Sequence, residues 1–416
     1  MKPKYLQFIT AALLLFVSII PAKAQNGLDY ITISGEVRDA DTNKKLENVI
    51  IAVSSTNITT ITNADGVFSI KVKKSLGATK LVFSHVGYIS QEFAITNNDM
   101  RNVKITLHSI EYSIEGAVVG TEALALVKKA IERIGDNYSP KTNMLTGFYR
   151  ETIKKRNSYI NISEAITYSY KTSYSQERGN DRVQIFKGRQ LLSPKASDTL
   201  IVKLQGGPTT SVYLDAVRTW DLLTDPGVLY LYKFSLSGSV MIDGRPHYIV
   251  NFRPQVIVSY ALLYGKLYID EETLTFTKVE ANLSMDDENK ATQVMLKKKP
   301  YGLRFKPEGL SYEVTYKRQG HVSYLNYMRT ELTFKCDWKR KIFRSNYLIV
   351  AEMVITDIND QDVEKIPARL AFNEKHSLSD KVANFYDENF WEDFNIIEPT
   401  ESLESAVNKL RKKVKQ

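Results

Sequence analysis

The sequence is almost without cysteine, and this excludes one common source of stability. Cys336 is the single cysteine among 416 residues, so no disulfide can form within the chain and its domains must depend on packed cores. Cys336 lies in an alternating segment, which predicts a buried side chain and not a reactive thiol. The net charge of +9 is modest and dispersed. Nucleic acid is therefore not an expected partner, although a weak attraction to anionic envelope surfaces is compatible with this charge.

Long apolar runs are also missing after the first residues of the chain. The N-terminus carries Lys2 and Lys4, an apolar run from Phe8 to Ile20, and a small-x-small site at Ala22-Lys23-Ala24. This pattern is typical of a secretory signal peptide, because the run is shorter than the ~20 residues that span a membrane. We therefore expect an exported protein, in the periplasm or associated with the outer membrane, with no transmembrane helix in the mature chain.

Motifs that would indicate catalysis are absent or unconvincing. His108-Ser109-Ile110-Glu111 matches the His-x-x-Glu of zinc peptidases, but it follows a predicted strand and no catalytic domain precedes it. No histidine pair has helical spacing, and the sequence has no nucleophile elbow and no phosphate-binding loop with an adjacent lysine. The segment Gly206-Gly207-Pro208-Thr209-Thr210 is interpreted as a structural loop, because Pro208 has no N–H to offer an anion. We predict no enzyme activity, no cofactor and no metal site.

Two acidic triplets are compatible with carboxylate chemistry. Asp270-Glu271-Glu272 and Asp286-Asp287-Glu288 are predicted at strand ends, where carboxylates are usually solvated. A glycosidase needs two acids that face each other at ~5–10 Å, and such a pair meets only in the folded chain. Weak Ca²⁺ binding at one of these turns is also compatible with the sequence.

Short strands separated by turn residues fill the first part of the mature chain. Asp65-Gly66 supplies a tight turn, after which Phe68 and Ile70 alternate into a half-buried strand. Strands are predicted near residues 31–37, 49–54, 67–72, 80–84, 91–95 and 103–107. Their regular spacing is typical of a small β-sandwich.

Helical periodicity follows this region. Apolar residues recur at three- and four-residue steps from Leu124 to Ile134, which predicts an amphipathic helix over residues 121–136. Further helical segments are predicted at residues 211–223 and 400–416. Cations gather near the end of the last segment, where they suit the negative end of a helix dipole.

A long antiparallel sheet is predicted from about residue 145 to residue 357. Apolar and charged residues alternate there, as in Lys266-Leu267-Tyr268-Ile269-Asp270, so one face of the sheet is expected to be wet. A sheet of this length must curl, close or be covered, because bare edges aggregate. Asp243-Gly244 and Gln319-Gly320 are predicted hairpin turns.

Aromatic residues are abundant, with 24 tyrosines and 17 phenylalanines. In a curved sheet such side chains usually form core, and the alternative is an apolar or glycan-facing groove. The candidate ligand-facing residues are Tyr168, Tyr170, Tyr260, Tyr264 and Tyr268.

Several motifs resemble known families. Ser34-Gly35-Glu36-Val37-Arg38-Asp39, the turn at Asp65-Gly66 and Val86-Gly87-Tyr88 resemble the carboxypeptidase-regulatory-like domain, a prealbumin-like β-sandwich. Gly147-Phe148-Tyr149-Arg150-Glu151 and Phe390-Trp391-Glu392-Asp393-Phe394 resemble segments of exported Bacteroidetes proteins that are named only for this domain. The resemblance implies no assigned reaction. By pattern, the sheet region is also similar to open half-barrels that carry lipoproteins in the periplasm.

These features predict a mainly β protein with a few helices. An N-terminal prealbumin-like β-sandwich is followed by a large curved antiparallel sheet, half-barrel-like and packed by helices. The expected segments are a signal peptide (1–24), the sandwich (25–110), a linker and helix (111–140), the β-rich domain (141–395) and a basic helix (396–416).

The predicted function is non-catalytic binding or scaffolding at the periplasmic side of the outer membrane. The expected partner is an outer-membrane protein, a glycan or a lipid. A second hypothesis is a periplasmic carrier that holds a lipid or acylated ligand in its curved sheet. A third hypothesis is a carbohydrate-active enzyme.

Overall fold

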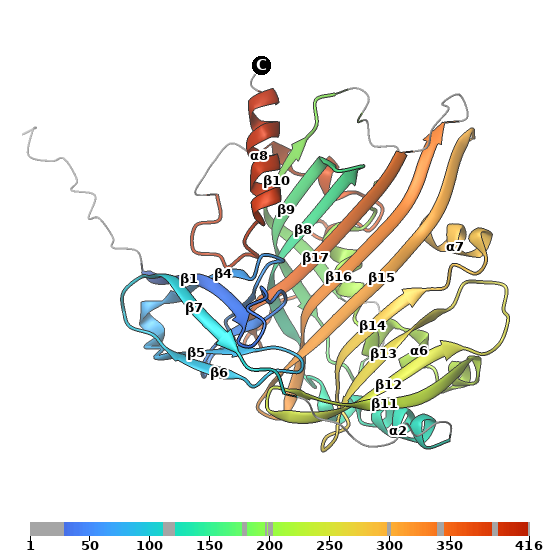
Figure 1. The fold of residues 1–416 in the computed structure, drawn as a ribbon, viewed down its shortest axis with the longest axis horizontal. Coiled ribbons are helices and arrows are strands. Elements are labelled where there is room, and N and C mark those ends of the chain that lie inside the picture. The colour runs from blue at the N-terminus through green and yellow to red at the C-terminus, as the bar shows by residue number, and fades with distance from the viewer. Residues whose placement is uncertain are drawn as a thin grey trace, which may run out of the picture.

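The computed structural model describes residues 29–110, 121–176, 181–195, 198, 203–297, 301–338, 345–384 and 390–414. The predicted signal peptide (1–24) and most of the predicted linker (111–120) lie outside these residues. The described chain folds into a small N-terminal sandwich and a much larger curved sheet (Figure 1). Within the described residues, none of the helices has the length and apolar character needed to cross a membrane.

The N-terminal sandwich contains two sheets with strand orders β4-β1-β7 and β3-β2-β5-β6. Its elements are β1 (Tyr30–Asp39), β2 (Ile50–Val53), β3 (Thr59–Ile61), β4 (Val67–Lys73), η1 (Lys74–Leu76), β5 (Lys80–Ser84), β6 (Gln91–Ala94) and β7 (Met100–Leu107). Phe68 and Phe83 meet edge to face in its core, with ring centroids 5.2 Å apart. Gly66 has a φ of 70°, as expected for the predicted turn. Strand β3 is an element that the sequence pattern did not predict.

The large sheet is open and has eleven strands in the described part of the chain. Their order is β11-β12-β13-β14-β15-β16-β17-β8-β9-β10-β18. All neighbouring strands are antiparallel except the short β18, which pairs parallel with β10. The strands are β8 (Asn143–Lys155), β9 (Ser158–Lys171), β10 (Arg182–Leu192), β11 (Tyr232–Ile242), β12 (Arg245–Pro254), β13 (Leu263–Asp270), β14 (Phe276–Leu283), β15 (Leu303–Gln319), β16 (Val322–Trp338), β17 (Ser345–Asn359) and β18 (Ala383–Asn384). The predicted fold class is confirmed.

Two tight turns join long hairpins where the sequence predicts them. Asp243 and Gly244 have φ values of 51° and 71° and connect β11 to β12. This is the pattern of a type I′ turn, whose twist matches that of the flanking strands. Gly320, with a φ of 61°, joins β15 to β16.

Helices line the concave side of the large sheet. They are α2 (Thr121–Glu132), α3 (Ile134–Asn137), α4 (Gly207–Tyr213), α5 (Ala216–Thr219), α6 (Asp221–Thr224), η3 (Pro226–Leu231), α7 (Glu288–Met295) and η4 (Leu378–Asp380). The helix predicted over residues 211–223 is divided into three, because Asp215 and Trp220 have non-helical ψ angles of 95° and 122°. Apolar residues of these helices and of the sheet form one large core, which includes Leu223, Val314 and Met353.

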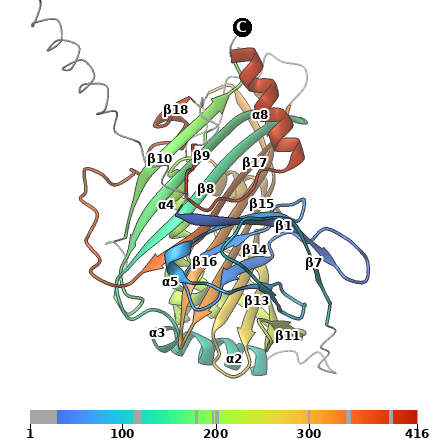
Figure 2. The same cartoon turned by 90° about the vertical axis from the view of Figure 1, so that its left-hand side faces the viewer.

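The convex side of the sheet carries the N-terminal sandwich and the C-terminal segment. Ile61 of β3 packs in a cluster with Phe148, Tyr327 and Trp391. Viewed from the side, the blue N-terminal strands lie across the large sheet, with α8 (Glu401–Val414) above them (Figure 2).

Cys336, the single cysteine of the chain, is buried, as predicted.

Residues 390–400, here called the strap, bind both parts of the molecule on this convex side. Asn395 exchanges two hydrogen bonds with the backbone of Lys71 in β4, at 2.7 and 3.2 Å. Arg150 of β8 donates to the Ile397 carbonyl at 2.7 Å. The strap therefore connects the sandwich to the large sheet by polar contacts as well as by Trp391.

Candidate ligand-binding pocket

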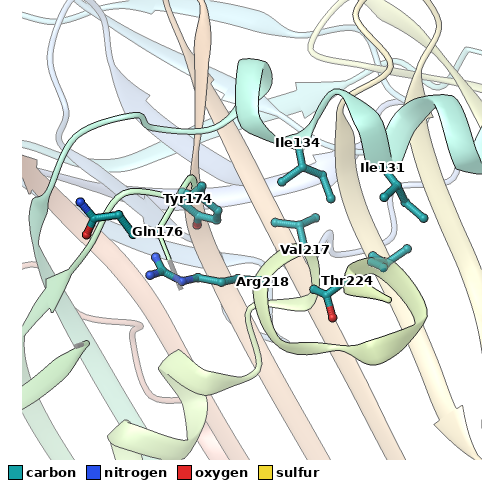
Figure 3. A pocket seen from close by; sticks show the side chains of 8 residues that line it. Ile131, Ile134, Tyr174, Gln176, Val217, Arg218 and Thr224 are labelled. Atoms are coloured by element: carbon teal, nitrogen blue, oxygen red, sulfur yellow. The ribbon is translucent and has the colours of Figure 1, made fainter. Parts of the chain in front are cut away.

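A pocket of about 580 Å³ opens on the concave side of the large sheet. Figure 3 shows Ile131 and Ile134 on one side and Val217, Arg218 and Thr224 on the other. The pocket is lined by Ile131, Ile134, Tyr174, Gln176, Val217, Arg218, Leu223 and Thr224. Its volume lies within the range of known small-molecule sites.

The apolar wall follows from the amphipathic pattern of the first helix. Val127 faces the core and is fully buried, whereas Ile131 and Ile134 are only half-buried and line the pocket. Val217 and Leu223 form the opposite apolar wall from α5 and α6. The two walls can therefore contact an apolar group of a ligand without any rearrangement of the core residues behind them.

A buried ionic cluster lies next to the polar end of the pocket. Lys171, the last residue of β9, is 2% exposed, and Asp215, between α4 and α5, is 0% exposed. Their Nζ and Oδ2 atoms are 2.6 Å apart. Burying these charges is costly, and their pairing offsets the cost. The contact joins a strand of the sheet to the helices that cover it.

A second acid and a second cation complete the ionic cluster. Asp181 lies 3.4 Å from Lys171 and 3.5 Å from Arg218. It accepts hydrogen bonds from the backbone N–H and the hydroxyl of Thr172, both at 2.9 Å. Burial raises the pKa of Asp181, but Lys171, Thr172 and Arg218 lower it more, so it stays below the ordinary value. Two carboxylates thus balance two cations.

Three tyrosines surround the ionic cluster. Tyr174 and Tyr316 donate hydrogen bonds to the two oxygens of Asp215, at 2.8 and 2.7 Å. The ring of Tyr138 lies 5.1 Å from each of the other two rings. Burial, reinforced by the charge of Asp215, holds the pKa of all three hydroxyls well above the ordinary value. These groups therefore act as hydrogen-bond donors near neutral pH.

The charged groups of the ionic cluster are paired with one another and with neighbouring hydroxyls. Asp215 accepts bonds from Lys171, Tyr174 and Tyr316, and Asp181 is engaged by two cations and by Thr172. Such a fully paired network is rigid, because each member would leave others unsatisfied if it moved. Arg218 and the adjoining Tyr174 line the pocket and form its polar floor, and the charges that balance Arg218 lie buried behind them.

A buried acid stands further along the concave face. Glu151 of β8 is 1% exposed, and it accepts a hydrogen bond from the Tyr149 hydroxyl at 3.1 Å. No described residue forms an ion pair with it. Burial raises the pKa of Glu151 to about 7, and the charge of Asp380 acts in the same direction. This group is a titratable feature of the interior near neutral pH.

None of the five tyrosines predicted to face a ligand lines this pocket. Tyr168 and Tyr170 are half-buried in β9, and Tyr168 lies 5.2 Å from the ring of Phe186. Tyr268 is buried and donates to Glu280 at 3.2 Å. Tyr260 and Tyr264 are 51% and 45% exposed. That these residues contact a ligand stays a prediction.

The residues of the ionic cluster were not identified from the sequence. In β9 the structure buries Ser169 and Lys171 and leaves Tyr168 and Tyr170 half-buried, the reverse of what the alternation of aromatic and polar residues predicts. A lysine on the inward face of a strand indicates a buried partner. Asp181, Asp215 and Arg218 lie in loops and short helices, so nothing in their local sequence pairs them with Lys171.

The acidic triplets contain residues with structural roles. Asp270 pairs with Arg245 at 2.6 Å and accepts from the backbone and hydroxyl of Thr273. Burial raises its pKa, but these donors lower it more, to below the ordinary range. Asp287 caps the N-terminus of α7. No group of three or more His, Cys, Asp or Glu side chains suited to a metal ion occurs in the described parts of the chain, and Glu111 of the His-x-x-Glu motif lies outside them.

Comparison with known proteins identifies one domain. Residues 33–119 match the family model of the CarboxypepD_reg-like domain, in agreement with the resemblance of the N-terminal region. No curated protein matches the chain.

Two solved structures are distant matches. A DUF1329 family protein from Desulfovibrio piger is 10% identical, with a TM-score of 0.29, and the match covers 60% of this chain and 100% of that protein. A structure of lipovitellin that concerns its lipid–protein interactions is 9% identical, with a TM-score of 0.26 and coverage of 62% and 29%. Both TM-scores are too low to establish a common fold.

Proposed function

We propose that this chain is a non-catalytic binding protein of the cell envelope, and that its concave pocket holds the apolar part of an amphipathic ligand. The observation that carries the proposal is the 580 Å³ pocket, with apolar walls and a charge-balanced polar floor. A pocket with these features is suited to a small molecule that has one apolar and one polar end.

The floor favours a ligand whose polar end is neutral. The charges of Lys171 and Arg218 are already balanced by Asp181 and Asp215 within the ionic cluster. A charged ligand would therefore lose its hydration without gaining an equivalent partner. Hydroxyl or amide groups can instead form hydrogen bonds at the polar end of the pocket, where Gln176 is exposed.

The envelope assignment is supported by the sequence of residues 1–24, which has the three parts of a secretory signal peptide. The CarboxypepD_reg-like domain provides a second module, with a core of its own, on the opposite side of the large sheet. In this proposal the sandwich and the strap support the large sheet, and the pocket provides the specificity.

The test is direct binding of a neutral single-chain amphiphile, such as a monoacylglycerol, to the purified full chain by isothermal titration calorimetry. Ile134→Trp should fill the pocket and weaken binding by about tenfold or more, the loss expected when an apolar group is displaced. Lys129→Trp, on the exposed side of α2, is the matched control and should bind as the parent does. Equal binding by both variants contradicts the pocket assignment. Metal-dependent turnover of a peptide or glycan panel contradicts the non-catalytic assignment.

A further inference from the structure

An exposed apolar loop lies at one corner of the large sheet. Ile257, in the connection between β12 and β13, is 95% exposed, and its neighbours Val256 and Tyr260 are 36% and 51% exposed. Tyr230 of η3 is 67% exposed. We call these four residues the apolar tip. Clustered exposure of this kind marks an interaction surface more often than isolated exposed residues do.

The apolar tip is fixed in its exposed position. Gln255 donates its backbone N–H to the Leu231 carbonyl at 2.9 Å and its side chain to the Tyr230 carbonyl at 2.7 Å. Lys290 of α7 donates to the Val258 carbonyl at 2.7 Å. Val258 itself packs against the main core. The loop is therefore anchored at both ends while Ile257 between them points away from the core.

Cations flank the apolar tip on the convex side of the sheet. Lys233 and Arg253 are exposed and directly opposite each other on β11 and β12. Lys266 of β13 is exposed and lies two residues after the exposed Tyr264, on the same face of the strand. No described residue forms an ion pair with any of these three cations. Lys233 and Arg253 thus form a pair of like charges beside an apolar surface, and Lys266 adds a third cation across from Glu280.

One nearby acid shares the convex face with these cations, and two others cap helices on the other side of the sheet. Glu280, opposite Lys266 in the sheet, is engaged by Lys278 at 2.8 Å. Asp225 caps η3, and Asp287 caps α7, both on the helical side of the sheet. The convex flank of the apolar tip therefore has a predominantly positive surface.

We infer that the apolar tip and its cations dock on an anionic phospholipid bilayer. Tyrosine side chains favour the membrane interface, an aliphatic residue inserts below it, and Lys or Arg side chains bind anionic headgroups. The inference rests on the proposed function, since η3 directly follows α6, and α6 supplies Leu223 and Thr224 to the pocket.

Co-sedimentation of the full chain with lipid vesicles tests this inference. The chain should bind vesicles that contain phosphatidylglycerol, should bind pure phosphatidylcholine vesicles much less, and should be released by salt because the attraction is screened. Ile257→Asp should reduce partitioning by about tenfold or more. The double variant Lys233→Glu/Arg253→Glu should reduce it by roughly fivefold for each cation.

Two control variants test whether any exposed residue would give the same effect. Ile89→Asp removes another exposed aliphatic residue, which is 54% exposed in the N-terminal sandwich, and Lys44→Glu/Lys74→Glu removes two exposed cations there. Both should bind vesicles as the parent does. If the parent chain does not sediment with anionic vesicles, or Ile257→Asp sediments equally well, the inference is wrong. It is also wrong if Ile257→Asp converts a dimer to a monomer in sedimentation velocity without any vesicle binding.

The pocket variant separates this inference from the proposed function. Ile134→Trp should lose the amphiphile and keep vesicle binding, whereas Ile257→Asp should lose vesicle binding and keep the amphiphile in calorimetry. If the parent chain binds vesicles but not the amphiphile, only the proposed function of the pocket is contradicted. If it binds the amphiphile but not vesicles, only the inferred docking on a bilayer is contradicted.

Discussion

At the scale of single residues, Lys171 is the most consequential side chain of the candidate site. It is 2% exposed and contacts both Asp215 and Asp181. Lys171→Met removes the cation and leaves both buried carboxylates with less compensation. We expect the free energy of unfolding to fall by about 3–5 kcal/mol, as is typical when one partner of a buried pair is removed. Urea denaturation followed by tryptophan fluorescence measures the loss.

Lys187→Met provides the matched control for Lys171. Lys187 pairs with Glu392 at 3.0 Å, but both side chains are accessible to solvent. Because exposed pairs contribute little, the control should lose less than about 1 kcal/mol. Equal losses in the two variants would show that the ionic cluster does not support the fold.

Glu151 should make stability depend on pH in the opposite direction from a salt-bridged acid. Burial raises its pKa from 4.5 to about 7, so between these values the folded chain binds more protons than the unfolded chain. Stability is therefore favoured at low pH and falls as the pH rises through this window, by about 3 kcal/mol for this group. Above about pH 7 the full penalty of the buried charge is present.

Glu151→Gln should abolish this contribution, because the amide stays neutral and can still accept from Tyr149. The difference in unfolding free energy between Glu151→Gln and the parent chain should grow in favour of the variant from pH 4.5 to pH 7. Urea midpoints at a series of pH values measure it. A constant difference across that window would mean that Glu151 does not titrate as described.

The residue scale also shows why the candidate site could not be predicted in full. In β9 the aromatic residues Tyr168 and Tyr170 alternate with Ser169 and Lys171, so the sequence pattern predicts a solvated Lys171, whereas the structure buries it. Asp215 meets Lys171 only because the helices after β10 fold back over the concave face. The local sequence does not indicate how these helices fold back, so the pairing of Asp215 with Lys171 depends on the tertiary structure.

At the scale of elements, the strap should control how firmly β4 is held. Asn395→Ala removes both hydrogen bonds to the backbone of Lys71. We expect a local loss of about 1–2 kcal/mol, the usual net value for two such bonds. Hydrogen exchange of the β4 amides should accelerate, while exchange in β15 and β16 should not change.

Asn408→Ala, on the exposed side of α8, is the control for the strap and should leave β4 protected. If Asn395→Ala also leaves exchange in β4 unchanged, the strap is not what protects this strand.

Elements with strong periodicity were predictable, whereas short elements that depend on tertiary contacts were not. The helical spacing of apolar residues predicted α2, and the alternation of apolar and polar residues predicted the strands of the large sheet. The helix predicted over residues 211–223 is interrupted at Asp215, whose carboxylate reaches the ionic cluster. β3 has only three residues, and its place depends on contacts such as that of the Thr59 hydroxyl with the Ile355 carbonyl at 2.7 Å.

At the scale of the whole molecule, the contact between sandwich and sheet decides whether the chain moves as one body. The sequence indicated two modules but not their contact, because the residues that form it lie far apart along the chain. Ile61 of the sandwich packs with Phe148 and Tyr327 of the sheet, and Asn63 donates to the carbonyls of Glu398 and Pro399 in the strap. The contact is formed by segments that are distant in sequence.

Ile61→Asp should separate the two modules without unfolding either one. Ile61 is 2% exposed, so a charge there must be hydrated by opening the contact. Each module has a core of its own, around Phe83 in the sandwich and around Met353 in the sheet, and should stay folded. Small-angle X-ray scattering should show a larger radius of gyration with an unchanged circular dichroism spectrum.

Val67→Asp, at a position 36% exposed in the same sandwich, is the control and should scatter as the parent chain does. An unchanged scattering curve for Ile61→Asp would mean that Ile61 does not hold the modules together, and that the strap alone joins them.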